Sequence, residues 1–175
     1  MPSSDLIRWG GVAAMLAGVV FIVRSLLPPM GIGDAFHFVA LFLLAVGVVG
    51  FHALQKDHYG LIGLAGFAIV VIAALASVVA RIVILVSGSE ALFPIVAVGG
   101  IGLMLGFALY GVATLRARVL PLWVGVAFIV GVPIRYALFP IDPWGLTLFG
   151  LLWVALGYVL WSRREAVADQ PSRVS

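Results

Sequence analysis

The sequence contains no cysteine and few charged residues. Without cysteine, the chain has no disulfide, thiolate metal site, iron–sulfur cluster or catalytic thiol of its own. Only 10% of its 175 residues are charged, whereas charged residues make up about a quarter of a typical soluble domain. Hydrophobic residues make up 64%. The composition therefore excludes a water-soluble globule and predicts an integral membrane protein.

Lysine and histidine are also scarce, which limits the cofactors that the chain can hold. Lys56 is the single lysine and lies in a predicted loop, so a retinal Schiff base is not expected. His37 and His52 fall on one predicted helix, and the other predicted helices contain no histidine to complete a pair of axial haem ligands. The nearby cluster of His52, Lys56, Asp57 and His58 offers too few ligands for a metal site. We predict no cofactor and no metal site.

Long apolar runs separated by short turns predict six transmembrane helices and no strand. The predicted helices cover about residues 8–27, 35–54, 61–86, 91–115, 121–138 and 144–161. We therefore expect an all-α membrane protein with a single domain over residues 1–161. Residues 162–175 are expected to form a short polar cytoplasmic tail.

The distribution of basic residues predicts the orientation of these helices. Six spans place both termini on one side of the membrane. That side collects seven basic residues, Arg8, Lys56, Arg116, Arg118, Arg163, Arg164 and Arg173, and the other side has three, Arg24, Arg81 and Arg135. The positive-inside rule makes both termini cytoplasmic, and we expect the bacterial inner (plasma) membrane. The pI of about 9.8 then reflects topology, and no nucleic-acid binding is predicted.

An arginine near the outer end of each odd-numbered helix is followed by an acid. The pairs are Arg24 with Asp34, Arg81 with Glu90, and Arg135 with Asp142. This repetition predicts three tandem two-helix hairpins, related by a pseudo-threefold axis along the membrane normal. The three arginines would then surround one outer vestibule.

Charges at this depth are candidates for ligand binding, because each costs about 2.5–3.5 kcal/mol to insert at the centre of a helix. The predicted ligand-binding residues are Arg24, Arg81, Arg135, Asp34, Glu90 and Asp142, together with Trp153 near the middle of the last helix. In the alternative interpretation, each arginine only pairs with the acid of its own hairpin and fixes the loop. We expect Arg81 to couple to an acid from another hairpin.

Catalysis is a further alternative at the same end. His37 follows Asp34 by three residues, so the two side chains share a helix face, and Glu90 is a second candidate base. Ser87, Ser89 and Tyr136 are predicted at the same level. No recognised catalytic spacing surrounds these residues, so we do not predict an enzyme as the main function.

Small residues at helical spacing predict close helix packing. The pairs are Gly102 with Gly106, Ala14 with Gly18, and Gly150 with Gly157. We expect these pairs to pack inside the bundle, with a homodimer face or a partner membrane protein as the alternative.

Our leading hypothesis is a small multi-pass protein that binds a small anionic or amphipathic molecule in an outer arginine-lined pocket. An extension of this hypothesis is that the protein also transports the molecule through that pocket. The second hypothesis is a structural or accessory subunit of a larger membrane complex. The third is a membrane-embedded enzyme that uses His37 with Asp34 or Glu90. The lipid bilayer is the partner common to all three.

Overall fold

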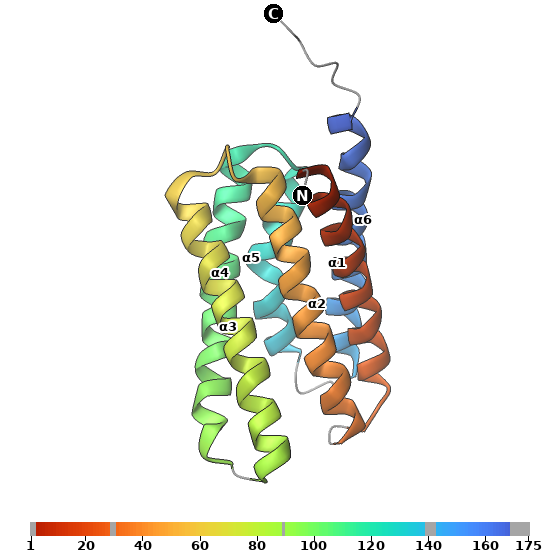
Figure 1. Cartoon of the computed structure of the whole chain (residues 1–175), viewed down its shortest axis with the longest axis vertical. Helices are drawn as coiled ribbons and strands as arrows, with labels where there is room; N and C mark the ends of the chain where they lie inside the picture. The colour runs from red at the N-terminus through yellow and green to blue at the C-terminus, as the bar shows by residue number, and fades with distance from the viewer. Residues whose placement is uncertain (1–2, 29–30, 89, 139–142, 169–175) are drawn as a thin grey trace, which may run out of the picture.

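Six α-helices and one short 3-10 helix make up the computed structural model, which describes residues 3–28, 31–88, 90–138 and 143–168 (Figure 1). The regular structure in these ranges is entirely helical, as predicted. In order, the elements are α1 (Ser3–Ser25), α2 (Ile32–Gln55), α3 (Gly60–Ser87), η1 (Glu90–Leu92), α4 (Phe93–Ala117), α5 (Leu122–Ala137) and α6 (Trp144–Ala168).

The helices run up and down in alternation, so the start of α1 and the end of α6 lie at the same end of the bundle (Figure 1). We call this the terminal end. The opposite end holds the C-terminal ends of α1, α3 and α5, and we call it the arginine end. Arg24 and Arg135 lie in the last turns of α1 and α5, and Arg81 lies six residues before the end of α3. At the arginine end, α3 ends at Ser87. The next residue, Gly88, has a φ of 65°, a left-handed conformation that glycine adopts without steric cost.

Each helix contacts the helices before and after it, and α6 also contacts α1, so the six helices close into a ring. The contacts are extensive within two groups of three, α6–α1–α2 and α3–α4–α5. They are smaller at the two seams where the groups meet, between α2 and α3 and between α5 and α6. The first two predicted hairpins, α1–α2 and α3–α4, are therefore closely packed pairs. The third departs from them, because α6 packs mainly on α1 and α5 packs mainly on α4.

Glycines explain why these groups pack so closely. On α1 and α6, Gly18 and Gly150 face each other, and a methyl group on Gly150 would lie 2.6 Å from the carbonyl oxygen of Gly18. On α3 and α4, a methyl group on Gly106 would lie 2.9 Å from the backbone nitrogen of Val70. In lipid, where apolar surface is not driven out of water, such close backbone approach is a main source of helix association. The small residues singled out in the sequence thus pack inside the bundle, as predicted.

The exterior of the ring is apolar, as expected for a lipid-facing surface. Ile72, Val79 and Leu105 lie in the middle parts of their helices and are exposed. Five helices are long and apolar enough to cross a membrane; the remaining one, α5, has 16 residues. At about 1.5 Å per residue α5 is about 24 Å long, less than the hydrocarbon thickness of about 30 Å.

Aromatic side chains fill the centre of the ring. Phe128 contacts Phe51, Phe107 and Tyr110, with ring centroids 5.1–5.7 Å apart. Trp153 from α6 packs edge-to-face against Phe107 at 5.7 Å and is 2% exposed. The aromatic side chains of this layer come from α2, α4, α5 and α6. The layer therefore joins the two groups of helices in the middle of the bundle, between the arginine end and the terminal end.

Candidate functional site

A cavity of about 150 Å³ lies inside the ring toward the arginine end. All six helices contribute to its wall, and it is far larger than the roughly 10–15 Å³ that one water molecule requires. The lining residues are Phe21, His37, Leu41, Leu44, Ser77, Arg81, Val96, Gly100, Leu103, Phe107, Val132, Arg135, Tyr136, Leu146 and Phe149.

The ionisable residues of the lining lie toward the arginine end, whereas apolar residues line the cavity along its whole length. Arg81, Arg135 and His37 supply the ionisable groups, whereas Leu44 and Phe107 lie toward the aromatic centre. His37 and Leu44 are separated by about 10 Å along α2 at 1.5 Å per residue. The cavity is therefore amphipathic along its length, with cationic groups at one end and hydrocarbon at the other.

Helical spacing explains which side chains reach this cavity. On α2, His37, Leu41 and Leu44 follow one another by four and three residues, which places them on one face. On α3, Ser77 lies one turn before Arg81. The sequence analysis did not include Ser77, although its spacing of four residues from Arg81 was the signal that would have found it.

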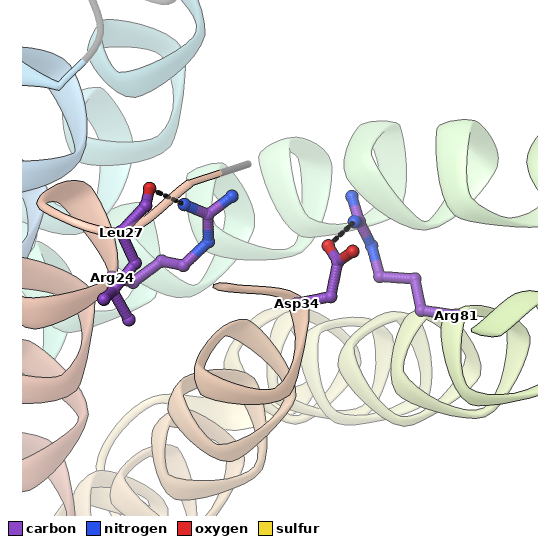
Figure 2. A network of polar contacts seen from close by, with 4 residues as sticks. All are labelled: Arg24, Leu27, Asp34 and Arg81. Atoms are coloured by element: carbon purple, nitrogen blue, oxygen red, sulfur yellow. Dashed lines mark hydrogen bonds and ion pairs between the residues drawn. The ribbon is translucent and has the colours of Figure 1, made fainter. Parts of the chain in front are cut away.

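Arg81 forms an ion pair with Asp34, with 3.9 Å between Nη1 and Oδ1 (Figure 2). Arg81 comes from α3 and Asp34 from the first turn of α2, so the pair crosses the seam between the two groups of helices. This contact joins the second predicted hairpin to the first, and the coupling energy that we expect for it remains a prediction. The Nε–H of Arg81 is buried and has no hydrogen-bond partner among the described residues.

Arg24 extends from the end of α1 toward the start of α2 (Figure 2). Its Nη1 donates a hydrogen bond to the carbonyl oxygen of Leu27 at 3.2 Å, and a methyl group on Gly33 would lie 3.0 Å from its Cζ. Gly33 thus leaves room for the guanidinium group. Arg24 does not line the cavity, so its position fits capping of the α1 end better than direct contact with the cavity interior.

Arg135 lies on the last turn of α5 and does line the cavity. On the opposite wall, His37 packs edge-to-face against Phe21, with 5.9 Å between ring centroids. Arg81, Arg24 and Arg135 all lie close enough to His37 to act on it electrostatically. Of the three arginines predicted to surround one vestibule, Arg81 and Arg135 therefore line the cavity, and Arg24 lies at the same end of the bundle outside the lining.

Tyr136 brings a hydroxyl group to the same wall because Gly100 on α4 leaves space for it. A methyl group on Gly100 would lie 2.5 Å from the hydroxyl oxygen of Tyr136. Ser87 is also at this end, but it is exposed and its hydroxyl donates to the carbonyl oxygen of Val83 at 2.7 Å. The hydroxyl group of Ser87 is therefore hydrogen-bonded within its own helix, whereas Tyr136 and Ser77 line the cavity.

The remaining predicted residues have different positions. Trp153 is part of the aromatic centre and is absent from the cavity lining. Glu90 begins η1, between α3 and α4, and its side chain is outside the described part of the structure. Asp142 and Ser89 lie outside the described residues. Among the described residues, Arg81 pairs with Asp34, which the sequence analysis had assigned to Arg24.

A second polar cluster lies at the terminal end, around the predicted loop that contains Lys56. Gln55 is fully buried, and its Nε2 donates to the hydroxyl oxygen of Tyr110 at 3.3 Å. The ring nitrogen Nδ1 of His52 is hydrogen-bonded to the hydroxyl of Tyr59. Burial raises the pKa of Tyr59 to about 12. Part of the predicted loop region is therefore an ordered, packed polar layer.

Among the described residues, no three histidine, aspartate or glutamate side chains gather as metal ligands do. The cavity instead offers guanidinium, imidazole and hydroxyl groups, which suit an anion. Comparison with protein-family models, curated proteins and solved structures found no match to the chain.

Proposed function

We propose that the protein binds a small anionic, amphipathic molecule in the cavity at the arginine end. The observation that carries this proposal is the composition of the cavity wall. Arg81 and Arg135 lie toward the arginine end, and apolar side chains that include Leu44 and Phe107 lie deeper in the bundle. The charged group of the ligand would contact the arginines, and its hydrocarbon part would contact the deeper apolar side chains.

The state of Arg81 supports an anionic ligand over a neutral one. Its ion pair with Asp34 is long, at 3.9 Å, and its buried Nε–H has no hydrogen-bond partner among the described residues. Leaving a buried donor unsatisfied costs about 1–3 kcal/mol. A carboxylate, sulfonate or phosphate that accepts hydrogen bonds from this guanidinium would remove that cost.

We also propose that the ring spans a membrane with its terminal end on the cytoplasmic side of the bacterial inner membrane. The apolar exterior and the five helices of sufficient length support the membrane placement. The predominance of arginine and lysine at the terminal end supports the orientation. The short α5 crosses in this arrangement because it lies in the ring between α4 and α6.

Binding, rather than continuous passage, is the function that we assign to this conformation. Beyond the cavity toward the terminal end, the buried aromatic side chains of Phe128, Tyr110 and Phe51 fill the space between helices. A transported molecule would have to displace this layer, so transport would require a second conformation of the ring.

The test is calorimetric titration of the protein in phosphatidylcholine nanodiscs with octanoate, and with octylammonium as a cation of the same chain length. Empty nanodiscs correct for partitioning into lipid. We expect saturable binding of octanoate only, weakened at least about tenfold by Arg81→Gln, because one charge-assisted hydrogen bond is lost. Arg116→Gln is the matched control, since Arg116 is an exposed arginine at the terminal end.

Two results would contradict the proposal. One is equal binding of the anion and the cation, which would show that the cavity is not selective for charge. The other is an equal effect of Arg81→Gln and Arg116→Gln, which would assign the arginines to topology and favour the accessory-subunit hypothesis.

A further inference from the structure

A groove of about 220 Å³ lies between α5 and α6, beside the cavity. The residues that line it are Ala127, Val130, Gly131, Ile134, Arg135, Gly145, Leu148, Phe149 and Leu152. Among the described residues of this lining, Arg135 is the one with an ionisable side chain, and the others are apolar. The groove is therefore a second, more apolar space that shares an arginine with the cavity.

The groove opens on the outer surface of the ring. Leu148 on α6 is 53% exposed, and Ile134 on α5 is also exposed. In a membrane this surface faces lipid chains, because the exposed side chains on both helices are apolar. Molecules dissolved in the bilayer thus have direct access to the groove.

The groove and the cavity meet at Arg135 and Phe149, which line both. Arg135 lies near the end of α5, whereas Ala127 lies about 12 Å away along the same helix at 1.5 Å per residue. A molecule lying in the groove would therefore have its hydrocarbon along α5 and α6 and its end beside the guanidinium group of Arg135.

The seam between α5 and α6 is built more loosely than the others. These two helices make the least contact of any neighbouring pair in the ring. A methyl group on Gly131 would meet the side-chain tip of Leu152, at 2.8 Å, and no backbone atom of α6 within 4 Å. By contrast, a methyl group on Gly111 would lie 2.6 Å from the carbonyl oxygen of Gly125, in the contact of α4 with α5. The close backbone approach between α5 and α6 lies instead at the arginine end, where a methyl group on Gly145 would lie 3.1 Å from the carbonyl oxygen of Leu138. At Gly131, α5 and α6 can separate without breaking a close backbone contact.

We propose that the groove between α5 and α6 admits a long-chain carboxylate from the bilayer, with its acyl chain along the groove and its carboxylate on Arg135. This proposal rests on the proposed function and names the ligand class as a fatty-acid anion. A single chain suits a groove formed by two helices, and a guanidinium group pairs with a carboxylate through two parallel hydrogen bonds. Entry from the side removes the need to carry the hydrocarbon through water.

The experiment uses a palmitate analogue with a photoactivatable diazirine on its chain, in phosphatidylcholine nanodiscs that contain the full chain. After illumination, the labelled residues are identified by mass spectrometry. We expect labelling concentrated on the residues that line the groove. Leu148→Trp should reduce this labelling at least about fivefold, because the indole would fill the groove, and Arg135→Gln should reduce it at least about tenfold.

Leu151→Trp is the matched control. Leu151 is 52% exposed, lies on the same helix and does not line the groove. This variant should leave labelling unchanged. Both tryptophan variants replace an exposed apolar residue, so the fold of each is checked by its unfolding midpoint in detergent.

Equal labelling of the two tryptophan variants, or labelling spread evenly around the exterior, would overturn the proposal. If octanoate binding still depended on Arg81 in that case, the cavity would remain a binding site reached by another route. If neither octanoate nor palmitate depended on an arginine, the proposed function would fail as well. If residues of the groove instead cross-linked to a second copy of the chain and were not labelled by the palmitate analogue, the groove would be a dimer contact and not an entrance for lipid.

Discussion

At the scale of single residues, Arg81 links the fold to the proposed site. It lines the cavity and contacts Asp34 at 3.9 Å, so a single guanidinium group joins α3 to α2 and faces the proposed ligand. Both side chains are partly accessible, at 35% for Arg81 and 26% for Asp34, so water or a ligand can compete for either group. We therefore expect the pair to contribute modestly to stability.

A double-mutant cycle with Arg81→Gln and Asp34→Asn measures this contribution. We expect a coupling energy of about 0.5–1 kcal/mol, the upper part of the range for partly exposed ion pairs. The measurement is reversible unfolding in mixed micelles with increasing sodium dodecyl sulfate. The control cycle combines Arg81→Gln with Asp5→Asn, because Asp5 lies at the terminal end and its change should be additive. Coupling equal to that of the control would contradict the observed contact.

At the scale of helices, small residues decide which elements pack closely. Gly106 on α4 lies against Val70 on α3, and Gly111 lies against Gly125 on α5. Gly18 on α1 similarly faces Gly150 on α6. The two groups of three helices are each held by such contacts, whereas the seam between α5 and α6 has a close approach only near the turn, between Gly145 and Leu138, among the described residues. The seams are therefore the places where the ring would separate first.

Gly106→Leu is expected to destabilise the bundle by about 1–3 kcal/mol or more, the usual cost of overpacking. Even a methyl group there would lie 2.8 Å from Val70 Cγ2 and 2.9 Å from the backbone nitrogen of Val70, so α3 and α4 would have to move apart. Thermal unfolding in detergent measures the effect. Val98→Leu is the control, because Val98 is an exposed residue of the same helix. Similar unfolding midpoints for the two variants would place Gly106 outside a tight interface.

At the scale of the whole molecule, the ring has two chemically different ends. The arginine end holds the cavity, the ion pair and the three arginines. The terminal end holds the polar layer of His52, Gln55 and Tyr59. Alternation of the helices places these ends on opposite sides of any membrane that the ring spans (Figure 1).

Reporter fusions test this placement. Fusion after Gly88, which follows α3 at the arginine end, should report the outer side, and fusion after the C-terminal Ser175 should report the cytoplasm. A matched pair of reporters, one active only outside and one only in the cytoplasm, should give opposite results at each site. The same sidedness at Gly88 and Ser175 would contradict the six-span arrangement, and the short α5 would then be the helix that does not cross.

The sequence by itself determined the number of helices, their approximate limits and their alternating direction. These properties are local: a long apolar run forms a helix in lipid because its backbone groups must bond within the run, and proline, glycine and charged residues end it. Observed limits such as Gly60–Ser87 for α3 therefore differ from the prediction by one residue at each end. The largest difference is α6, which continues to Ala168, past the end predicted at Trp161.

Only the tertiary structure decided which helices are partners and what lies between them. A membrane helix with apolar residues on several faces carries no strong periodic signal for the face that is buried. The packing of α6 on α1 depends on the fit of Gly18 against Gly150, two residues far apart in the chain, and this fit is not readable from either segment alone. The same holds for the cavity, because Ser77, Phe107 and Phe149 become neighbours only when the ring closes.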